Sequence, residues 1–277
     1  MNKLLIVGYG DISGRVDARL AAGIERRLLS RRFGFDLDRP ETLSGIAGWA
    51  DAILHCAPPP AEGETDPRTT HLLAALEKGH ILPMRLVYLS TSGVYGDCGG
   101  ARVDESRPPN AHSARARRRA DAERQLAAWC APRAVALVVL RVPGIYAADR
   151  LPLARLRAGT PALRAEDDVY TNHIHADDLA SIVLRALNDD APPGVYNACD
   201  DTQMKMGDWF DFVAERHGLP RPRRIARSEA AGRISPALLE FMSESRQLDN
   251  ARLKARLGVR LAYPTVEQGV PLARSAE

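Results

Sequence analysis

The chain has 277 residues, of which 45% are hydrophobic and 26% are charged, and its net charge is +3. This composition is ordinary for a globular domain with a large core, and the small charge does not indicate a nucleic-acid partner. No apolar run approaches the ~20 residues needed to span a bilayer, and the short apolar start lacks a signal-peptide cleavage site. We therefore expect a cytoplasmic protein that binds neither nucleic acid nor a membrane.

Short apolar runs alternate with helical patterns through the first two-thirds of the chain. Such runs are typical of strands that are buried on both faces of a parallel sheet. The alternation predicts an α/β fold with a Rossmann-like, doubly wound parallel sheet. The predicted strands are Leu4–Val7, Ala52–Ala57, Leu86–Ser90 and Val135–Leu140, and the predicted helices are Ile12–Ala22, Glu41–Trp49, Thr69–Lys78 and Ser113–Trp129.

The pattern changes after Arg141, where turn residues become frequent. We expect one domain over residues 1–277, in which residues from about 150 to 165 and from about 200 to 277 form a smaller, helical substrate lobe. Two last sheet strands are predicted at Val169–Ile174 and Val195–Ala198. The predicted helices of this part are Asp177–Asn188, Met206–His217, Pro236–Met242 and Asp249–Leu257.

A glycine-rich turn follows the first strand and contains Gly8 and Gly10. Glycines at this place let backbone N–H groups approach a pyrophosphate at the positive end of a helix. The pattern normally has a third glycine where Ser13 stands, with Gly14 beside it. Because serine is small, this departure weakens the match without abolishing it. The turn predicts dinucleotide binding.

The segment after this turn is short. Only 25 residues separate the turn from Asp36, although a strand, a helix and a further strand normally need about twice that length. We interpret Glu25–Ser30 as a shortened second strand without its following helix, and Asp36–Arg39 as the end of a third strand. Arg31 and Arg32 then lie where the 2′-phosphate of NADP is bound. In the alternative interpretation Asp36 is the acidic residue that selects NAD. Of the two cofactors, NADP is slightly favoured.

Four segments in the middle of the chain resemble the extended short-chain dehydrogenase/reductases: Ala52–Ala57, Arg85–Gly96, Val103–Glu105 and Leu140–Tyr146. That group includes the NAD-dependent epimerases and dehydratases that act on nucleotide sugars. Asn172–Ala180 resembles their late strand-to-helix segment and narrows the resemblance to an atypical bacterial branch of oxidoreductase-like proteins. The resemblance covers nearly the whole chain.

The resemblance implies cofactor contacts at the ends of several strands. Thr91 would hydrogen-bond the substrate oxygen, although a strand-capping hydroxyl is the structural alternative. The implied cofactor residues are Gly8, Gly10, Asp11 and Ile12 for the pyrophosphate, Asp36 and Leu37 for the adenine, Cys56, Ala57 and Pro58 for the ribose and nicotinamide path, Ser90 at the strand end, and Pro143, Gly144 and Ile145 over the nicotinamide.

The catalytic Tyr-x-x-x-Lys pair of that group is missing here. Arg115 stands at the tyrosine position and Arg119 at the lysine position. Arg119 can still bind a ribose or a phosphate, but Arg115 cannot exchange a proton near neutral pH. Tyr95 is a substitute proton donor in one interpretation and a packing residue in the other.

Two histidines and two aspartates follow one another at a predicted strand-to-helix junction. His173 and His175 point to the same side of the strand, so together with Asp177 and Asp178 they could bind a metal or exchange a proton. The structural alternative, which we favour, is hydrogen bonding of His175 and Asp178 at the start of the helix. The four cysteines are widely spaced and indicate neither disulfides nor zinc. No bound metal is expected.

Three functions are compatible with these features. The leading hypothesis is an NAD(P)-dependent oxidoreductase that acts on a small carbonyl or alcohol, or on a substrate like a nucleotide sugar, with a non-standard acid/base. The alternative is a dinucleotide-binding sensor or scaffold with little or no turnover. A fully active nucleotide-sugar epimerase is disfavoured, because that chemistry relies on the missing tyrosine. The sequence gives no substrate, and we expect a monomer or a homodimer.

Overall fold

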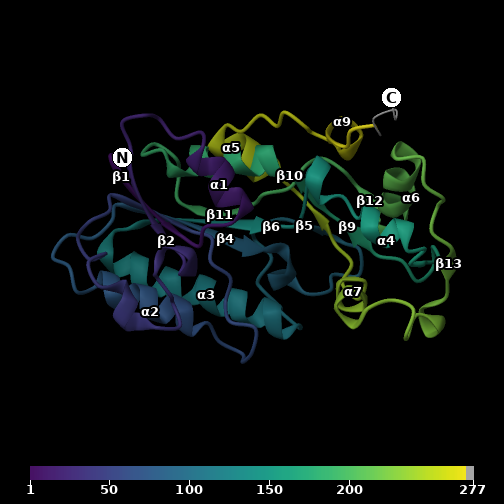
Figure 1. Ribbon diagram of the computed structural model, residues 1–277, viewed down its shortest axis with the longest axis horizontal. Coiled ribbons are helices and arrows are strands. Elements are labelled where there is room, and N and C mark those ends of the chain that lie inside the picture. The colour runs from purple at the N-terminus through teal and green to yellow at the C-terminus, as the bar shows by residue number, and fades with distance from the viewer. Residues whose placement is uncertain (273–277) are drawn as a thin grey trace.

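A six-stranded parallel sheet forms the centre of the computed structural model, which describes residues 1–272 (Figure 1). The strand order is β11-β6-β4-β3-β1-β2. The predicted α/β fold with a Rossmann-like, doubly wound sheet is confirmed. The strands are β1 (Lys3–Val7), β2 (Glu25–Leu29), β3 (Ala52–His55), β4 (Arg85–Thr91), β6 (Ala136–Val142) and β11 (Gly194–Asn197).

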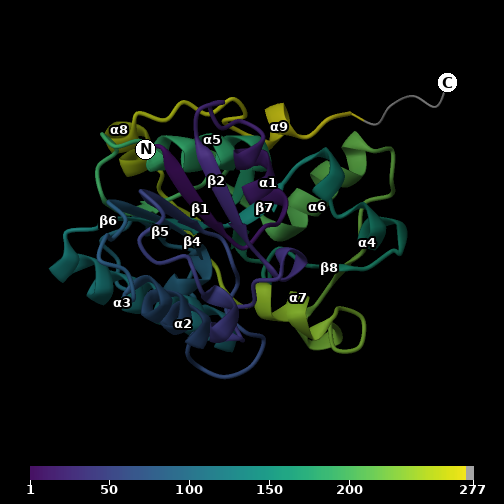
Figure 2. The same cartoon turned by 60° about the vertical axis from the view of Figure 1, so that its left-hand side comes forward.

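Helices cover both faces of this sheet (Figure 2). On one face α1 (Asp11–Asp17) packs against α5 (Ala176–Leu187), and on the other α2 (Pro67–Leu76) packs against α3 (Ala114–Cys130). The side chains of β1 alternate between the two cores: Leu4 and Ile6 face the first, Leu5 and Val7 the second. All four are fully buried, and each such burial contributes roughly 1.5–3 kcal/mol. A strand with two buried faces explains the unbroken apolar run.

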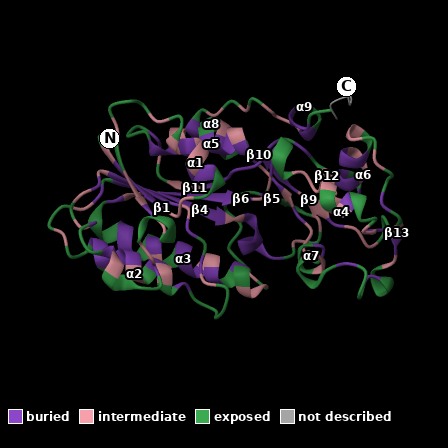
Figure 3. Cartoon of the chain, viewed as in Figure 1, coloured by how far each residue is buried: buried purple, intermediate pink, exposed green. Residues whose placement is uncertain are grey.

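The remaining elements are short, and several of them contribute to a third apolar cluster, which includes Trp209, Phe210 and Val213. Buried residues concentrate in the sheet and the inner helix faces (Figure 3). None of the helices in residues 1–272 is long and apolar enough to cross a membrane. The separation of a smaller substrate lobe from the rest of the domain stays a prediction. The short elements are β5 (Arg102–Val103), β7 (Gly144–Tyr146), β8 (Ala162–Leu163), β9 (Tyr170–Thr171), β10 (His173–His175), β12 (Met204–Lys205), β13 (Arg224–Ile225), β14 (Gln247–Leu248), α4 (Leu153–Arg157), α6 (Met206–Arg216), α7 (Pro236–Phe241), α8 (Ala251–Leu257) and α9 (Val266–Gly269).

The segment between β2 and β3 is shortened, as expected, but the predicted third strand at Asp36–Arg39 is wrong. The sheet ends at β2. The Asp36 carboxylate accepts a hydrogen bond from the Asp38 backbone N–H at 3.0 Å, and the Asp36 N–H donates to the Thr42 hydroxyl at 2.8 Å. These local bonds curl the chain into a turn, and Pro40 has no N–H to donate to a neighbouring strand.

Three further predictions need correction. The predicted helix Glu41–Trp49 is a 3-10 turn at Pro40–Leu43 followed by loop, because Gly45 and Gly48 adopt positive φ angles of 82° and 69° that no α-helix contains. The predicted strand Val169–Ile174 is divided between β9 and β10, which lie outside the central sheet. Helix α1 ends at Asp17 rather than at Ala22.

A close contact between Gly8 and Ala57 fixes the ends of the first three strands. Gly8 has a φ of +87°, and a Cβ atom there would lie 2.4 Å from the Ala57 nitrogen. The Gly8 N–H donates to the Leu29 carbonyl of β2 at 2.8 Å, and the Ala57 N–H donates to the Val7 carbonyl at 2.9 Å. Only glycine meets both requirements, the left-handed backbone and the absent side chain.

Replacing this glycine tests the contact. Gly8→Ala should lower the free energy of unfolding by about 2–5 kcal/mol, because it adds backbone strain to overpacking. Gly14→Ala is the matched control, since a Cβ at this helical glycine meets nothing within 4 Å, and it should stabilise the protein by up to about 1 kcal/mol. Urea unfolding measures both. Equal stability of Gly8→Ala and the wild type would contradict the contact.

Candidate functional site

A row of cavities follows the carboxyl ends of the strands, where open α/β sheets bind ligands. The four cavities have volumes of about 160, 360, 350 and 500 Å³. Neighbouring cavities share lining residues, so they form one continuous cleft. Gly8 and Pro58 line the first two, Ser90 and Arg119 line the second and third, and Thr91 lines the third and fourth.

The glycine turn lines the cavity of about 360 Å³. Gly8, Gly10, Asp11, Ile12 and Cys56, all expected at the cofactor, are found together there. The Gly10 N–H donates to the Ser13 hydroxyl at 2.7 Å, and this hydroxyl donates back to the Gly10 carbonyl at 3.1 Å. Ser13 therefore replaces the third glycine as a buried helix cap.

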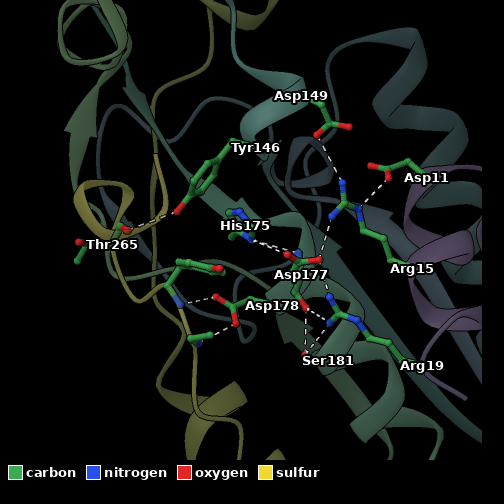
Figure 4. A network of polar contacts seen from close by, with 12 residues as sticks. Asp11, Arg15, Arg19, Tyr146, Asp149, His175, Asp177, Asp178, Ser181 and Thr265 are labelled. Atoms are coloured by element: carbon green, nitrogen blue, oxygen red, sulfur yellow. Dashed lines mark hydrogen bonds and ion pairs between the residues drawn. The ribbon is translucent and has the colours of Figure 1, made fainter. Parts of the chain in front are cut away.

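The Asp11 carboxylate puts a negative charge at the start of α1, and arginines neutralise it. Arg15 donates to it at 2.8 Å and Arg150 at 2.6 Å. Arg15 also reaches Asp177 on α5, at 2.9 Å (Figure 4). Although partial burial raises the pKa of Asp11, the hydrogen bonds from the two arginines hold it below its usual range. Arg150 lines the cavity too, so the cavity mouth carries a cation that the sequence reasoning had missed.

The cavity of about 160 Å³ lies at the end of β2. Arg31, Asp36, Leu37, Ala57 and Pro58 line it, whereas Arg32 does not. Arg31 forms no ion pair within residues 1–272 and is exposed. The Arg32 guanidinium lies 5.7 Å from the ring of its neighbour Phe33.

Ser30 also lines this cavity, and the sequence reasoning had missed it. Its hydroxyl oxygen is buried without a hydrogen-bond partner. An unpartnered buried hydroxyl is costly unless something else binds it. The signal was present in the sequence, because Ser30 directly follows the last strand residue and directly precedes Arg31.

Residues from β4, α3 and β7 line the cavity of about 350 Å³, including Ser90, Thr91, Arg119, Pro143 and Ile145. The neighbouring Gly144 lines the cavity of about 500 Å³. Thr91 lines the cleft, and its hydroxyl accepts the Gly93 N–H at 3.2 Å as a cap, which is the structural alternative; its contact with a substrate oxygen stays a prediction.

The two arginines that replace the Tyr-x-x-x-Lys pair both reach the cleft. Arg119 donates to the Leu89 carbonyl at 2.6 Å and to the Tyr88 hydroxyl at 3.2 Å. The Arg115 guanidinium lies 4.6 Å from the centre of the Phe241 ring. Neither is an acid/base, so α3 supplies the cleft with cations and no exchangeable proton.

A buried ion pair between Glu123 and Arg141 holds the Ser90 side chain at the end of β4. The Ser90 hydroxyl donates to the Glu123 carboxylate, which also accepts a hydrogen bond from Arg141 at 2.7 Å. All three side chains are buried. Losing either charge would leave the other uncompensated, which typically costs about 3–5 kcal/mol.

Tyr95 has no access to the cleft. Its side chain is fully buried, and its hydroxyl donates to Asn197 at 2.8 Å. Burial raises its pKa to about 12, so it holds its proton at neutral pH. The geometry supports the packing interpretation rather than proton transfer.

The two histidines of β10 have different surroundings. His175 accepts the Asp177 N–H at 3.2 Å and caps α5, as expected. Asp178 instead accepts hydrogen bonds from the N–H groups of Ala262 and Tyr263 at 2.7 and 2.9 Å and so anchors the C-terminal segment (Figure 4). His173 lines the cavity of about 500 Å³. Within residues 1–272, no group of three or more His, Cys, Asp or Glu side chains is arranged to hold a metal ion.

The cavity of about 500 Å³ combines aromatic and charged side chains. Tyr146, Trp209 and Phe210 line it together with Arg155 and Glu240. Two guanidinium nitrogens of Arg155 are buried without a partner. Burial lowers the pKa of this arginine to about 10, and it remains charged at neutral pH. The cavity therefore suits a polar molecule with an apolar part.

Comparison with known proteins places this geometry in context. Residues 34–199, more than half of the chain, match the sequence profile of the NAD dependent epimerase/dehydratase family. The match begins after the glycine turn and β2, and it includes α3, where Arg115 and Arg119 replace the usual pair. No curated protein matches the chain.

Three solved structures have a similar fold. A conserved protein of unknown function from Silicibacter pomeroyi DSS is 29% identical, with a TM-score of 0.77 and coverage of 97% of this chain and 96% of that one. RMD from Pseudomonas aeruginosa, complexed with NADPH, is 19% identical, with a TM-score of 0.74 and the same coverage. The UDP-glucose 4-epimerase from Thermus thermophilus, complexed with NAD, is 20% identical, with a TM-score of 0.74 and coverage of 98% and 97%.

Proposed function

Because this chain belongs to the NAD dependent epimerase/dehydratase family, we propose that it is an NADP-dependent oxidoreductase acting on a small carbonyl or alcohol. The observation that carries this proposal is the continuous cleft along the carboxyl ends of the sheet, from Ser30 to Trp209. Proteins of the same fold have been solved with NADPH and with NAD. We assign one part of the cofactor to each of three cavities, according to the residues that line it.

The glycine turn suits the pyrophosphate. A Cβ at Gly10 would meet nothing within 4 Å, so an open space lies in front of this residue, beside the start of α1. The first hydrogen bond within this helix joins the Gly14 N–H to the Gly10 carbonyl at 2.9 Å, which leaves the N–H groups of Asp11 and Ile12 free of helical bonds. Arg150 lines the same cavity and, through its bond to Asp11, offsets the negative charge that this carboxylate would present to a pyrophosphate.

The end of β2 suits the 2′-phosphate of NADP. Arg31 is exposed and offers a guanidinium without an ion pair among the described residues. The Ser30 hydroxyl is buried without a partner beside it, and a rotation of this side chain brings the hydroxyl into the cavity that both residues line. Asp36, the candidate for NAD selection, uses its carboxylate in the turn with Asp38. A phosphate oxygen accepts hydrogen bonds from both kinds of donor, so NADP is favoured over NAD.

The far end of the cleft suits the reacting groups. When bound, the nicotinamide ring supplies or accepts the hydride. Pro143 and Ile145 line the cavity of about 350 Å³, which Arg119 also lines, and the adjoining cavity of about 500 Å³. These two residues therefore hold and shield that ring. Thr91 lines both cavities, and its hydroxyl orients the substrate oxygen. Arg119, a permanent cation, stabilises a ribose or phosphate oxygen nearby.

The second candidate function is a dinucleotide-binding sensor or scaffold. The arginines on α3 favour it, because they stand where a tyrosine and a lysine would otherwise exchange a proton with the substrate. Against it stands the cavity of about 500 Å³ next to the proposed nicotinamide position. A sensor would not need a second cavity of this size.

Gly10→Ala tests the pyrophosphate position without disturbing the fold. Gly10 has φ −125° and ψ −159°, an extended backbone that alanine adopts. Because Gly10 is the N-cap of α1, the change should lower the free energy of unfolding by no more than about 1 kcal/mol. The methyl group should occupy space needed by the pyrophosphate and raise the Kd for NADPH about tenfold or more. Nicotinamide fluorescence measures this Kd. Unchanged affinity would place the pyrophosphate elsewhere.

Arg31→Ala tests the choice of cofactor. Losing a hydrogen-bonded charge pair should raise the Kd for NADPH by about tenfold, equivalent to about 1.4 kcal/mol, and leave the Kd for NADH unchanged. Arg32→Ala serves as the comparison, because Arg32 lies outside the cavity, and it should change neither constant. If both variants, or neither, alter the preference for NADPH over NADH, the assignment is wrong. Absence of NADPH and NADH binding at millimolar concentration would refute the proposed function.

A further inference from the structure

His173 lies where the proposed nicotinamide and substrate positions meet. It begins β10, which pairs in parallel with β7, and it stands opposite Gly144 in that pairing. A Cβ at Gly144 would be 3.6 Å from the His173 Cδ2 atom. His173 and Thr91 line the same cavity of about 500 Å³. The histidine is therefore adjacent to the segment that closes over the nicotinamide.

The ring nitrogens of His173 lack partners. Nδ1 is buried and makes no hydrogen bond. Nε2 makes none with residues 1–272 either, but unlike Nδ1 it is not sealed from the accessible space. Only 4% of the residue is exposed, and the residue lines the cavity of about 500 Å³. An unpartnered polar group in a buried position calls for a partner that the chain does not supply.

Aromatic neighbours fix the orientation of the imidazole. Its centre lies 4.4 Å from that of the Trp209 ring at an angle of 38°, and the Tyr146 ring meets it edge-on at 6.2 Å. The neighbouring carboxylates of Asp177 and Asp178 bind elsewhere, and no side-chain hydrogen bond or ion pair joins a carboxylate of residues 1–272 to this ring. Burial lowers its pKa to about 3, so the ring is neutral at neutral pH. A neutral imidazole offers one N–H donor and one acceptor.

Packing alone does not account for a histidine here. A phenylalanine would fill the same space between Trp209 and Tyr146 without leaving Nδ1 buried and unpartnered, which typically costs about 1–3 kcal/mol. His175, two residues on, uses its Nδ1 in the helix cap. His55, which is also fully buried, has its Nε2 3.1 Å from the Thr69 hydroxyl. Among these buried histidines, His173 is the one whose ring lacks a hydrogen bond.

We propose that His173 Nε2 hydrogen-bonds the reacting oxygen of the substrate, the contact that the missing tyrosine would otherwise make. This assignment rests on the proposed function. The ring donates to a carbonyl oxygen or accepts from a hydroxyl, and so orients and polarises the group opposite the nicotinamide. Water supplies the proton that the oxygen takes up when the carbonyl is reduced to an alcohol. Trp209, Phe210 and Tyr146 supply an apolar wall, which points to a carbonyl compound with an aromatic or apolar substituent.

The probe is 1-phenyl-1,2-propanedione, which combines such a substituent with adjacent carbonyls. Reduction is followed as NADPH oxidation at 340 nm (the nicotinamide band), and binding of the dione to the protein–NADP⁺ complex is followed by tryptophan fluorescence. Three variants are compared with the wild type. His173→Phe keeps the aromatic packing, His173→Gln returns an N–H near the Nε2 position, and His175→Asn is the control that removes the neighbouring imidazole but keeps a helix-capping side chain.

His173→Phe should lower kcat about 100-fold, the effect of losing one hydrogen-bond donor to a reacting oxygen, with NADPH affinity and Tm close to those of the wild type. His173→Gln should recover at least tenfold of that loss. His175→Asn should lower Tm without lowering kcat. Equal turnover by His173→Phe and the wild type would overturn the assignment, as would loss of activity in both His173 variants in proportion to a lower Tm.

The cofactor readout separates this proposal from the proposed function. A wild-type protein that binds NADPH but neither binds nor reduces the dione would overturn the role of His173 and leave the cofactor site intact. A wild-type protein that does not bind NADPH would overturn the proposed function itself, and the role of His173 with it.

Discussion

The close approach of Gly8 to Ala57 is the constraint on which the cleft depends. A side chain at Gly8 would collide with the backbone that follows β3, so the ends of β1 and β3 meet only because this residue has none. The Gly8 N–H also ties β1 to the end of β2. Gly8 and Pro58 then line both the cavity at the end of β2 and the cavity at the glycine turn. Relaxing this one contact would separate the two halves of the proposed cofactor site.

The charged side chains along the cleft are mainly arginines, and some of them stand where the related enzymes have a proton-transferring pair. Helix α3 carries Arg115 and Arg119 in place of a proton-transferring pair, and both guanidinium groups reach the cleft. At the glycine turn, Asp11 would repel a pyrophosphate, but Arg15 and Arg150 bind its carboxylate. The result is a cleft that remains suited to anions while lacking the usual acid/base. If the protein turns over a substrate, the proton chemistry must come from outside α3.

The sequence predicted the central sheet well because the strands are buried on both faces. Runs such as Leu4–Val7 and Leu86–Ser90 are apolar almost throughout, and the four apolar runs predicted as strands differ from β1, β3, β4 and β6 by at most two residues at each end. The amphipathic helices α5 and α6 are also close to their predicted ranges. Periodicity failed at Glu41–Trp49, where Gly45 and Gly48 adopt left-handed conformations. It also failed at Asp36–Arg39, where side-chain hydrogen bonds to the backbone replaced strand pairing.

The candidate site was predictable only in part. The residues drawn from the family resemblance line one cleft because parallel strands bring their carboxyl ends to one edge. Tyr95 could not be placed from sequence, since its burial depends on Asn197, which lies 102 residues further along the chain. The surroundings of His173 depend on Trp209 of α6, which is likewise distant in the chain. Ser30 was within reach of sequence reasoning, because its position at the end of β2 was correctly predicted.

A crystal structure of the protein grown with NADPH tests the central claim most directly. The account predicts the 2′-phosphate within hydrogen-bonding distance of Ser30 and Arg31, the pyrophosphate in front of Gly10, and the nicotinamide against Pro143 and Ile145. Crystals grown at millimolar NADPH with this cleft empty, or with the cofactor bound elsewhere on the molecule, would contradict it.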